Sequence, residues 1–227
     1  MIPQRNISLL SNRLTAGGAA RIREDVLERD YCLAWLLSAL AQSDLRPVLA
    51  FKGGTALKRC YFADYRFSED LDFTLREVLP FEAIRARLEP IYALLQEQSG
   101  IVFTFDRQDP RVRANTHTFY LRYTGPLPAS NDVKVDITIN EVLSFPLADR
   151  PVLRGYPEFT DLPEDRPILV YSLNEIAAGK NGRAHRSSSK RAERPLRSVV
   201  FDGKQRGTTR SDRSRDLSKI TISRKNL

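Results

Sequence analysis

The stretch FKGGTALKRCYFADYRFSEDLDFTL, residues 51–75, places a glycine turn ahead of two closely spaced carboxylates. Val48 to Phe51 is a short apolar run, and a segment with helical character follows, so Gly53-Gly54 falls where a strand passes into a helix. Backbone N–H groups at such a turn, and at the helix N-terminus after it, bind phosphate oxygens. The stretch therefore predicts a strand–turn–helix unit with a phosphate site.

The second feature of this stretch is Asp70-Leu71-Asp72. Residues two apart in an extended strand point to the same face, so we expect the carboxylates of Asp70 and Asp72 to lie side by side. Two carboxylates that close repel each other, and a hard divalent cation such as Mg²⁺ offsets the repulsion. This pattern predicts a metal site next to the phosphate site.

A third carboxylate is expected on a later strand. Over residues 132–140 apolar residues alternate with polar ones, which is the period of a half-buried strand, and Asp136 falls on the polar side. Three strand-borne carboxylates facing a glycine turn are the parts needed for two-metal phosphoryl transfer. In that chemistry the metals activate an attacking hydroxyl and stabilise the leaving pyrophosphate.

The rest of residues 1–178 shows alternating helical and strand periods. We expect an amphipathic helix over 23–41 and a second helix over 81–100, which is kinked at Pro90 and ended by Gly100. Strands are expected over 101–105, 116–125 and 132–140, followed by a connector over 144–167. Residues 168–180 should form a strand that passes into a helix, with Ser172 as its N-cap. The turn sequence GPLPASN predicts that the last two of the three strands are antiparallel neighbours.

Composition narrows the class of protein. The chain has 227 residues, 41% hydrophobic, and no apolar run near the roughly 20 residues that span a bilayer. The N-terminus lacks the apolar core of a signal peptide, so we expect a cytoplasmic protein without a membrane association. Cys32 and Cys60 lie in helical segments without metal-ligand spacing and are interpreted as buried thiols.

The net charge of +8 is unevenly distributed. Residues 1–178 carry 21 Lys+Arg and 24 Asp+Glu, a net charge of −3, whereas residues 179–227 carry 15 and 4, a net charge of +11. The second segment is rich in Arg and Ser and has little helical or strand period, which is typical of a disordered basic tail. We therefore place a domain boundary between residues 178 and 179.

Four motifs together resemble a known family. KGGTAL, R-F-S-E-D-L-D-F, V-D-I and Y-S-L-N-E-I-A-A-x-K, spread over residues 45–180, resemble the AbiEii/AbiGii toxin family of nucleotidyltransferases, in the DNA polymerase β-like superfamily. The resemblance implies an α+β fold, with a nucleotidyltransferase-type mixed sheet flanked by helices. It also implies a Mg²⁺-dependent toxin, paired with an antitoxin, that transfers a nucleotide from a nucleoside triphosphate, GTP or a pyrimidine triphosphate, to a tRNA or a protein.

The resemblance also assigns roles to residues. It implies metal ligation by Asp70 and Asp72, completion of the two-metal site by Asp136, which assists deprotonation of the acceptor, triphosphate contacts from Gly54 and Thr55, and neutralisation of developing charge by Lys180. Gly179 departs from the family pattern, which usually has Glu at that position.

The neighbours of the glycine turn complete the candidate nucleotide-binding set, which is Lys52, Gly53, Gly54, Thr55 and Ser68. Lys52 is alternatively only a surface residue beside the turn. Ser68 and Arg66 are alternatively residues that fix the loop before the strand.

Two other functions each fit part of the sequence. Asp70 to Thr74 also satisfies the D-x-D-x-T pattern of haloacid-dehalogenase-like phosphatases, in which the first Asp is a nucleophile after a strongly apolar strand. The residues before Asp70 are Tyr-Arg-Phe-Ser-Glu, and that interpretation leaves KGGTAL and Asp136 without a role. A non-enzymatic basic RNA-binding protein is the other alternative, and it rests only on residues 179–227.

The family resemblance fails where the charge changes sign, which suggests a frameshift. Gly-Lys-Asn-Gly, residues 179–182, is compatible with codons in which removal of one G restores the family's Glu-Lys. We hypothesise that residues 179–227 are an out-of-frame translation, so that the C-terminal helical lobe is truncated or scrambled, a change that can inactivate this copy. The coding DNA tests this: deletion of one base near codon 179 should open a long frame with helical periodicity.

Overall fold

The computed structural model describes residues 1–16, 21–111 and 114–179 of the chain. Their centre is one seven-stranded sheet in the order β3-β4-β5-β2-β1-β7-β6. The strands are β1 (Leu49–Lys52), β2 (Leu71–Leu75), β3 (Val102–Gln108), β4 (Thr116–Thr124), β5 (Asn131–Thr138), β6 (Leu147–Pro151) and β7 (Pro167–Tyr171). β2 runs parallel to β5 and β1 parallel to β7, whereas the other neighbouring pairs are antiparallel. The predicted mixed sheet of an α+β fold is confirmed.

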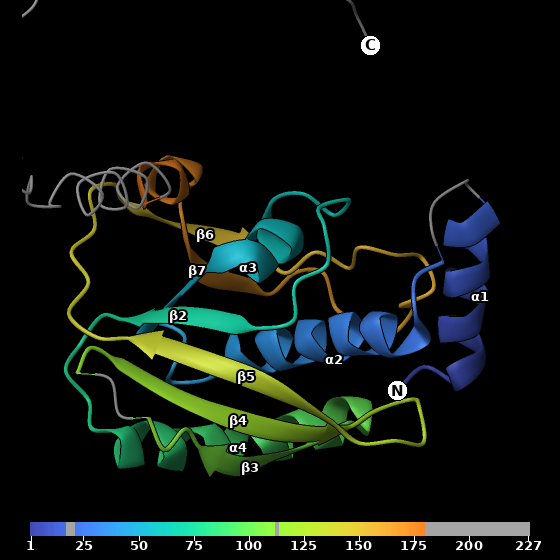
Figure 1. Ribbon diagram of the computed structural model, residues 1–227, viewed down its shortest axis with the longest axis horizontal. Helices are drawn as coiled ribbons and strands as arrows, with labels where there is room; N and C mark the ends of the chain where they lie inside the picture. Colours follow the sequence, from blue (N-terminus) through green and yellow to red (C-terminus); the bar gives the residue numbers. More distant parts are fainter. Residues whose placement is uncertain (17–20, 112–113, 180–227) are drawn as a thin grey trace, which may run out of the picture.

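Within the described residues four helices accompany the sheet: α1 (Gln4–Ala16), α2 (Glu24–Leu40), α3 (Gly53–Cys60) and α4 (Phe81–Ser99). A further helical segment covers residues 173–179. Figure 1 shows α2 and α4 along the same face of the sheet. Apolar side chains of these two helices meet those of β1, β2, β4 and β5, including Leu37, Leu88, Phe73, Phe119 and Ile137. This contact is the main hydrophobic core, and it leaves the other face of β2, β4 and β5 for polar residues.

β5 shows how the sequence pattern decides the two faces. Val133, Val135 and Ile137 are 1–3% exposed and point into the core, whereas Lys134 and Asp136 alternate with them and are only partly buried. Because successive strand residues point to opposite sides, the polar members of β5 lie on the face away from α2 and α4. This confirms the predicted half-buried strand, which the sequence placed over 132–140.

Most of the predicted elements are found with shifted ends. The antiparallel pairing of β4 with β5 is confirmed, and Gly100 ends α4 in the left-handed conformation at φ 76°. α4 nevertheless continues through Pro90 as one helix. Ser172 caps the last helical segment, because the backbone N–H of Glu175 donates to its hydroxyl at 3.4 Å.

Two elements were not predicted. Residues 144–167 are more than a connector, because β6 lies within them and pairs antiparallel with β7 at the edge of the sheet. α1 was also missed. Its residues Ile7 and Leu10 are fully buried, so packing stabilises a short helix whose polar composition gives a weak sequence signal.

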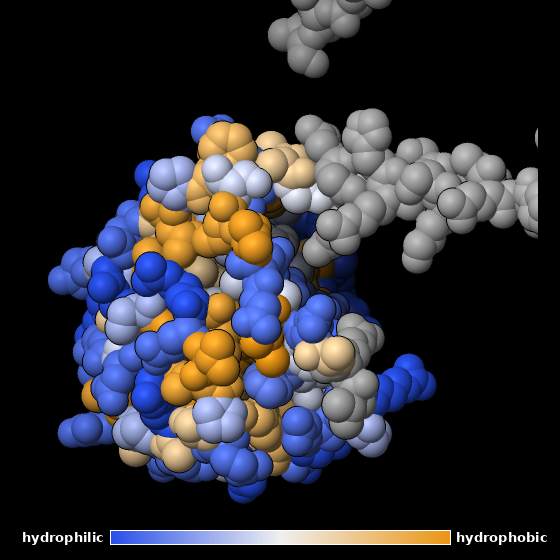
Figure 2. Space-filling view, turned by 90° about the vertical axis from the view of Figure 1, so that its left-hand side faces the viewer, coloured by the Kyte–Doolittle hydropathy of each residue, from blue (hydrophilic) through white to orange (hydrophobic). Residues whose placement is uncertain are grey.

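Apolar and charged side chains share the molecular surface shown in Figure 2, which is the left-hand side of Figure 1. The loop after β2 and the loop after β5 lie at this side in the ribbon view. They carry two of the most exposed large apolar residues of the described chain, Val78 at 82% and Val142 at 91%.

Both cysteines are buried and free, as predicted.

Candidate active site

A row of four polar residues crosses four adjacent strands on the face away from α2 and α4. In the strand registers Lys52 on β1 stands opposite Asp72 on β2, Asp72 opposite Asp136 on β5, and Asp136 opposite Thr118 on β4. Asp72 and Asp136 are 64 positions apart in the sequence, yet their strands are direct neighbours in the sheet. The fold thus brings together the second and third carboxylates that the sequence singled out.

Asp70 lies one residue before β2 rather than within it. Its backbone carbonyl accepts a hydrogen bond of 2.6 Å from the Thr55 hydroxyl, which ties the start of β2 to α3. Burial raises the pKa of Asp72, and the negative charges of Asp136 and Asp70 raise that pKa further. Asp72 is therefore close enough to Asp136 and to Asp70 for their charges to repel its own.

Asp136 is held by two donors. The Thr118 hydroxyl donates to its Oδ1 at 2.5 Å, and the Lys134 ammonium donates to its Oδ2 at 2.6 Å. The hydrogen bond from Lys134 to Asp136 raises the pKa of Lys134. Lys134 stands two positions before Asp136 on the same face of β5, so the alternating pattern could have indicated this pairing.

The glycine turn brings the first residue of α3 against the carboxylates. Gly53 has a φ of 83°, a left-handed backbone conformation that residues other than glycine rarely adopt. A Cβ added at this position would collide with Asp72 Oδ2. At Gly54 an added Cβ would lie 3.0 Å from the Ser68 hydroxyl oxygen. The predicted strand–turn–helix unit is present as β1 and α3, and both glycines leave room beside predicted site residues.

Two predicted nucleotide-binding side chains are already engaged within the protein. The Thr55 hydroxyl is bonded to the Asp70 carbonyl and the residue is 1% exposed, so its side chain is not available to a triphosphate. The Lys52 side chain is 13% exposed and donates to Glu141 and, at 2.9 Å, to the Thr138 hydroxyl. Lys52 is therefore a largely buried residue with two partners in the protein, and its contact with a nucleotide stays a prediction.

Glu141 is a site residue that sequence reasoning missed. Its Oε2 accepts hydrogen bonds from Lys52 and, at 2.7 Å, from the Thr74 hydroxyl, which also bonds the Tyr171 hydroxyl at 2.7 Å. Burial raises the pKa of Glu141, but the hydrogen bonds from Lys52 and Thr74 outweigh it and the net shift is downward. Only Thr74 carried a sequence signal, because it stands two positions after Asp72 on the same face.

A cavity of about 330 Å³ is lined by Lys52, Gly53, Asp72 and Glu141, among other residues. Its walls come from the glycine turn, the loop after α3, the end of β7 and the helical segment 173–179, and include Gly54, Arg66, Asp72, Glu141, Tyr171 and Glu175. Glu175 closes one wall, since its Oε2 accepts the backbone N–H groups of Ser144 and Phe145 at 2.9 and 2.7 Å. The cavity therefore joins the glycine turn with one carboxylate of the sheet, Asp72, and with the carboxylates of Glu141 and Glu175.

Arg66 contributes a cation to this cavity. Its guanidinium lies 3.6 Å from the position of an added Cβ on Gly54, and its side chain is exposed. Among the described residues we find no carboxylate paired with it, and its one hydrogen bond goes to the Phe67 carbonyl at 3.5 Å. Arg66 therefore has donors left over for an anion in the cavity.

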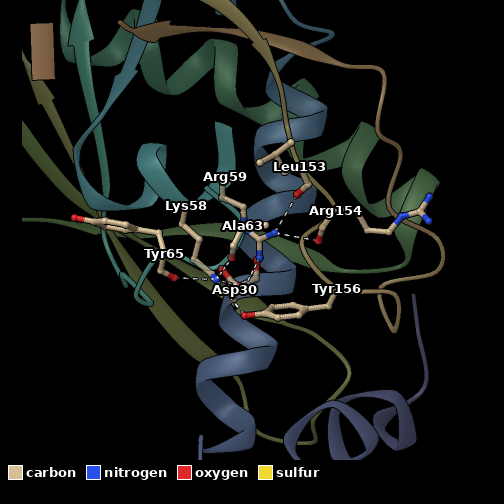
Figure 3. Close-up of polar contacts among 8 residues, drawn as sticks. All are labelled: Asp30, Lys58, Arg59, Ala63, Tyr65, Leu153, Arg154 and Tyr156. Atoms are coloured by element: carbon tan, nitrogen blue, oxygen red, sulfur yellow. Dashed lines mark hydrogen bonds and ion pairs between the residues drawn. The ribbon is translucent and has the colours of Figure 1, made fainter. Parts of the chain in front are cut away.

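A buried charge cluster holds the loop that carries Arg66 and Ser68 (Figure 3). The Lys58 ammonium, 2% exposed, donates to the carbonyl groups of Ala63 and Tyr65 at 2.9 and 3.2 Å. Burial is the main cause that lowers the pKa of Lys58. Its neighbour Arg59, in the last turn of α3, pairs with Asp30 of α2. The C-terminal end of α3 is therefore anchored to the core, while its N-terminal end carries the glycine turn.

The described residues do not form a converged metal centre. Across 1–16, 21–111 and 114–179, no group of three or more His, Cys, Asp or Glu side chains is arranged to hold a metal ion. Asp70 lies outside β2, and both oxygens of Asp136 accept protein hydrogen bonds. Lys180 and residues 180–227 lie outside the described residues, so the predicted role of Lys180 and the proposed frameshift remain predictions.

A family model described as the nucleotidyl transferase AbiEii toxin of a type IV toxin–antitoxin system matches residues 35–217. The chain belongs to the AbiEii family. The match includes every described candidate site residue and runs past residue 179, where the sequence suggested a boundary. Membership in the AbiEii family makes this a toxin-type nucleotidyltransferase of a toxin–antitoxin system, as the sequence motifs indicated.

A search of curated proteins returned no match to this AbiEii family member. None of the helices that could be described has both the length and the hydropathy needed to cross a membrane.

Proposed function

We propose that this chain transfers a nucleotide from a nucleoside triphosphate to an acceptor hydroxyl, using the cavity beside the glycine turn together with the carboxylates of β2 and β5. The observation that carries the proposal is that Asp72 lies opposite Asp136 in the sheet and also against the backbone of Gly53. It puts negative ligands for a cation and N–H donors for phosphate at one place. Family membership supports the same reaction class.

The phosphates are assigned to the start of α3. The first N–H groups of a helix have no partner within the helix, and the helix dipole favours negative charge there. Because Gly53 and Gly54 carry no side chain, a triphosphate can approach this backbone closely. Arg66, which overhangs Gly54, then supplies a cation for the same oxygens.

The residues present fit a divalent cation by donor type and charge. Asp72 and Asp136 face each other, Asp70 is near enough to act on Asp72, and carboxylate oxygens are the ligands that Mg²⁺ prefers. Asp72 and Asp136 would hold the cation, with Asp70 at the entrance to β2. A bound Mg²⁺ supplies charge stabilisation for the phosphoryl oxygens and for the leaving pyrophosphate.

The reaction breaks one bond and forms one. The acceptor oxygen bonds to the α-phosphorus, the bond between the α-phosphorus and the bridging oxygen breaks, and pyrophosphate leaves with its electron pair. In this proposal Asp136 takes the acceptor proton, and the hydrogen bond from the Thr118 hydroxyl to its Oδ1 supports the role by orienting the carboxylate. The acceptor is an RNA, for which tRNA is the first choice, or a protein, and a cognate antitoxin is the expected partner.

The phosphatase alternative gains no support from the fold. Its nucleophilic Asp should follow a strongly apolar strand, whereas Asp70 precedes β2 and Asp72 is near the start of it. The RNA-binding alternative rests on residues that are not described, apart from Gly179.

The decisive experiment incubates the protein with each α-labelled nucleoside triphosphate, Mg²⁺ and total tRNA, and measures label in the acceptor. The comparison is between wild type and the double variant Asp70→Ala plus Asp72→Ala. We expect transfer by wild type with one or two nucleotides and none by the variant. Transfer that survives the double substitution would disprove the site assignment, and phosphate release from simple monoesters without transfer would favour the phosphatase.

A further inference from the structure

Lys134 is a second cation beside the carboxylates of β2 and β5, and its ammonium lies where a metal ion is expected to bind. The Lys134 ammonium donates to Asp136 Oδ2 at 2.6 Å, while the Thr118 hydroxyl occupies Oδ1. Both oxygens of the third carboxylate are thus satisfied by the protein itself. The Lys134 side chain is 28% exposed, so its ammonium is in contact with solvent as well as with Asp136.

Lys134 also acts on the other two carboxylates. Its positive charge interacts with Asp70 and with Asp72, in addition to the direct contact with Asp136. Lys52, which stands opposite Asp72 on β1, is instead bonded to Glu141 and Thr138. Lys52 also lowers the pKa of Asp72, and by more than Lys134 does, but Lys134 is the cation that bonds directly to one of the three carboxylates.

We propose that Lys134 is an exchangeable counter-ion of this site, which a divalent cation binding to Asp72 and Asp136 displaces from Asp136 Oδ2. The inference rests on the proposed function, because it uses the cation that function requires. It goes further by assigning Lys134 the role of a competitor for the metal position.

Charge and side-chain freedom support the exchange. A divalent cation offers the carboxylates twice the charge of an ammonium, and it repels an ammonium bonded to the same oxygen. Lysine has a flexible four-carbon stem, so Lys134 can leave Asp136 without a change in β5. Thr118 keeps its bond to Oδ1 in the meantime and holds the carboxylate in the orientation a ligand needs.

The test measures Mn²⁺ binding by calorimetry and by the electron paramagnetic resonance of free Mn²⁺, at constant neutral pH, with purified full chain. Lys134→Met removes the competing charge but keeps the stem, and we expect a dissociation constant about five- to tenfold lower than that of wild type. We also expect Mn²⁺ to raise the melting temperature of Lys134→Met more than that of wild type, because the variant has no internal cation at the site.

Two controls separate this effect from a general change in surface charge. Lys134→Arg keeps a cation and should bind Mn²⁺ with near wild-type affinity. Arg122→Met removes another cation of the same sheet, one that pairs with Asp132 at 3.2 Å rather than with Asp136, and should leave the affinity unchanged.

Equal or weaker Mn²⁺ binding by Lys134→Met would overturn the inference, as would the absence of binding by both proteins. Label transfer is assayed on the same preparations. Transfer that depends on Asp72 without a difference in Mn²⁺ affinity would sink the role of Lys134 and leave the proposed function standing. Tighter Mn²⁺ binding by Lys134→Met without transfer by any protein would support Lys134 and overturn the proposed function.

Discussion

Asp72 and Asp136 lie directly opposite each other on the neighbouring parallel strands β2 and β5. The parallel pairing places them at the same level of the sheet and on the same face, where the repulsion between them raises the pKa of Asp72 on top of the effect of burial. A protein that keeps such a pair accepts a stability cost at this position, which is common at functional sites.

Asp72→Asn is the first prediction. The amide keeps the shape of the side chain but loses the charge that would bind a cation, so nucleotidyl transfer should fall by about 10²-fold or more. Because the substitution removes repulsion with Asp136 and Asp70, the free energy of unfolding in the presence of a chelator should be unchanged or higher. Transfer assays and urea titrations check the two parts, and a clear loss of stability would contradict the explanation of the raised pKa.

The sequence predicted the parts of the site that depend on local patterns. The turn at Gly53, the carboxylates at Asp70 and Asp72, and the polar position of Asp136 all follow from periods of two residues or from glycine chemistry. The order of the strands does not follow from such patterns. That β5 lies beside β2 is decided by long-range pairing, and the register of Asp72 with Asp136 came only with the structure.

The missed residues share one cause. Glu141 lies in an irregular loop after β5, and its function as partner of Lys52 depends on how that loop folds back over the end of β1. Asp30 sits in α2 where an amphipathic pattern assigns it no special place, although it is 2% exposed. Partners far apart in sequence carry no periodic signal, so a single sequence could not reveal either contact.

Gly53→Ala is the second prediction. The φ of 83° makes any side chain costly by about 1–2 kcal/mol, and the added Cβ would in addition push Asp72 from its position. We expect loss of nucleotide binding, measured with a fluorescent nucleoside triphosphate, together with a lower melting temperature. Gly100→Ala is the matched control, because its φ is 76° and its added Cβ would meet only Met1 at 3.8 Å. It should lower the melting temperature while nucleotide binding persists; equal binding by both variants would argue against a role of the turn.

Glu141→Gln is the third prediction, and it concerns pH. The folded-state pKa of Glu141 is lowered, so its stabilising effect is present above the unfolded pKa of about 4.3 and is lost as the pH falls through the folded pKa. Near pH 7 the variant should be less stable by about 1 kcal/mol, the upper range for a partly exposed ion pair. In acid the difference should close. Urea titrations at both pH values measure it, with exposed Glu164→Gln as control; a gap that widens in acid would refute the assignment.

Asp30→Asn is the fourth prediction, and it addresses the buried cluster of Figure 3. The carboxylate of Asp30 is 3% exposed, pairs with Arg59 and lies 4.0 Å from the Lys58 ammonium, so one anion serves two buried cations. Removal of that anion leaves both cations uncompensated in the core, which typically costs about 3–5 kcal/mol. Urea unfolding should show this loss, whereas Asp25→Asn on the same helix, whose partner Arg23 is exposed, should cost under about 1 kcal/mol.

Since Lys58 also holds the loop leading to Arg66, nucleotide affinity of any folded Asp30→Asn should drop as well. Similar small losses for both variants would show that hydrogen bonds to the backbone, rather than Asp30, hold the two cations in place.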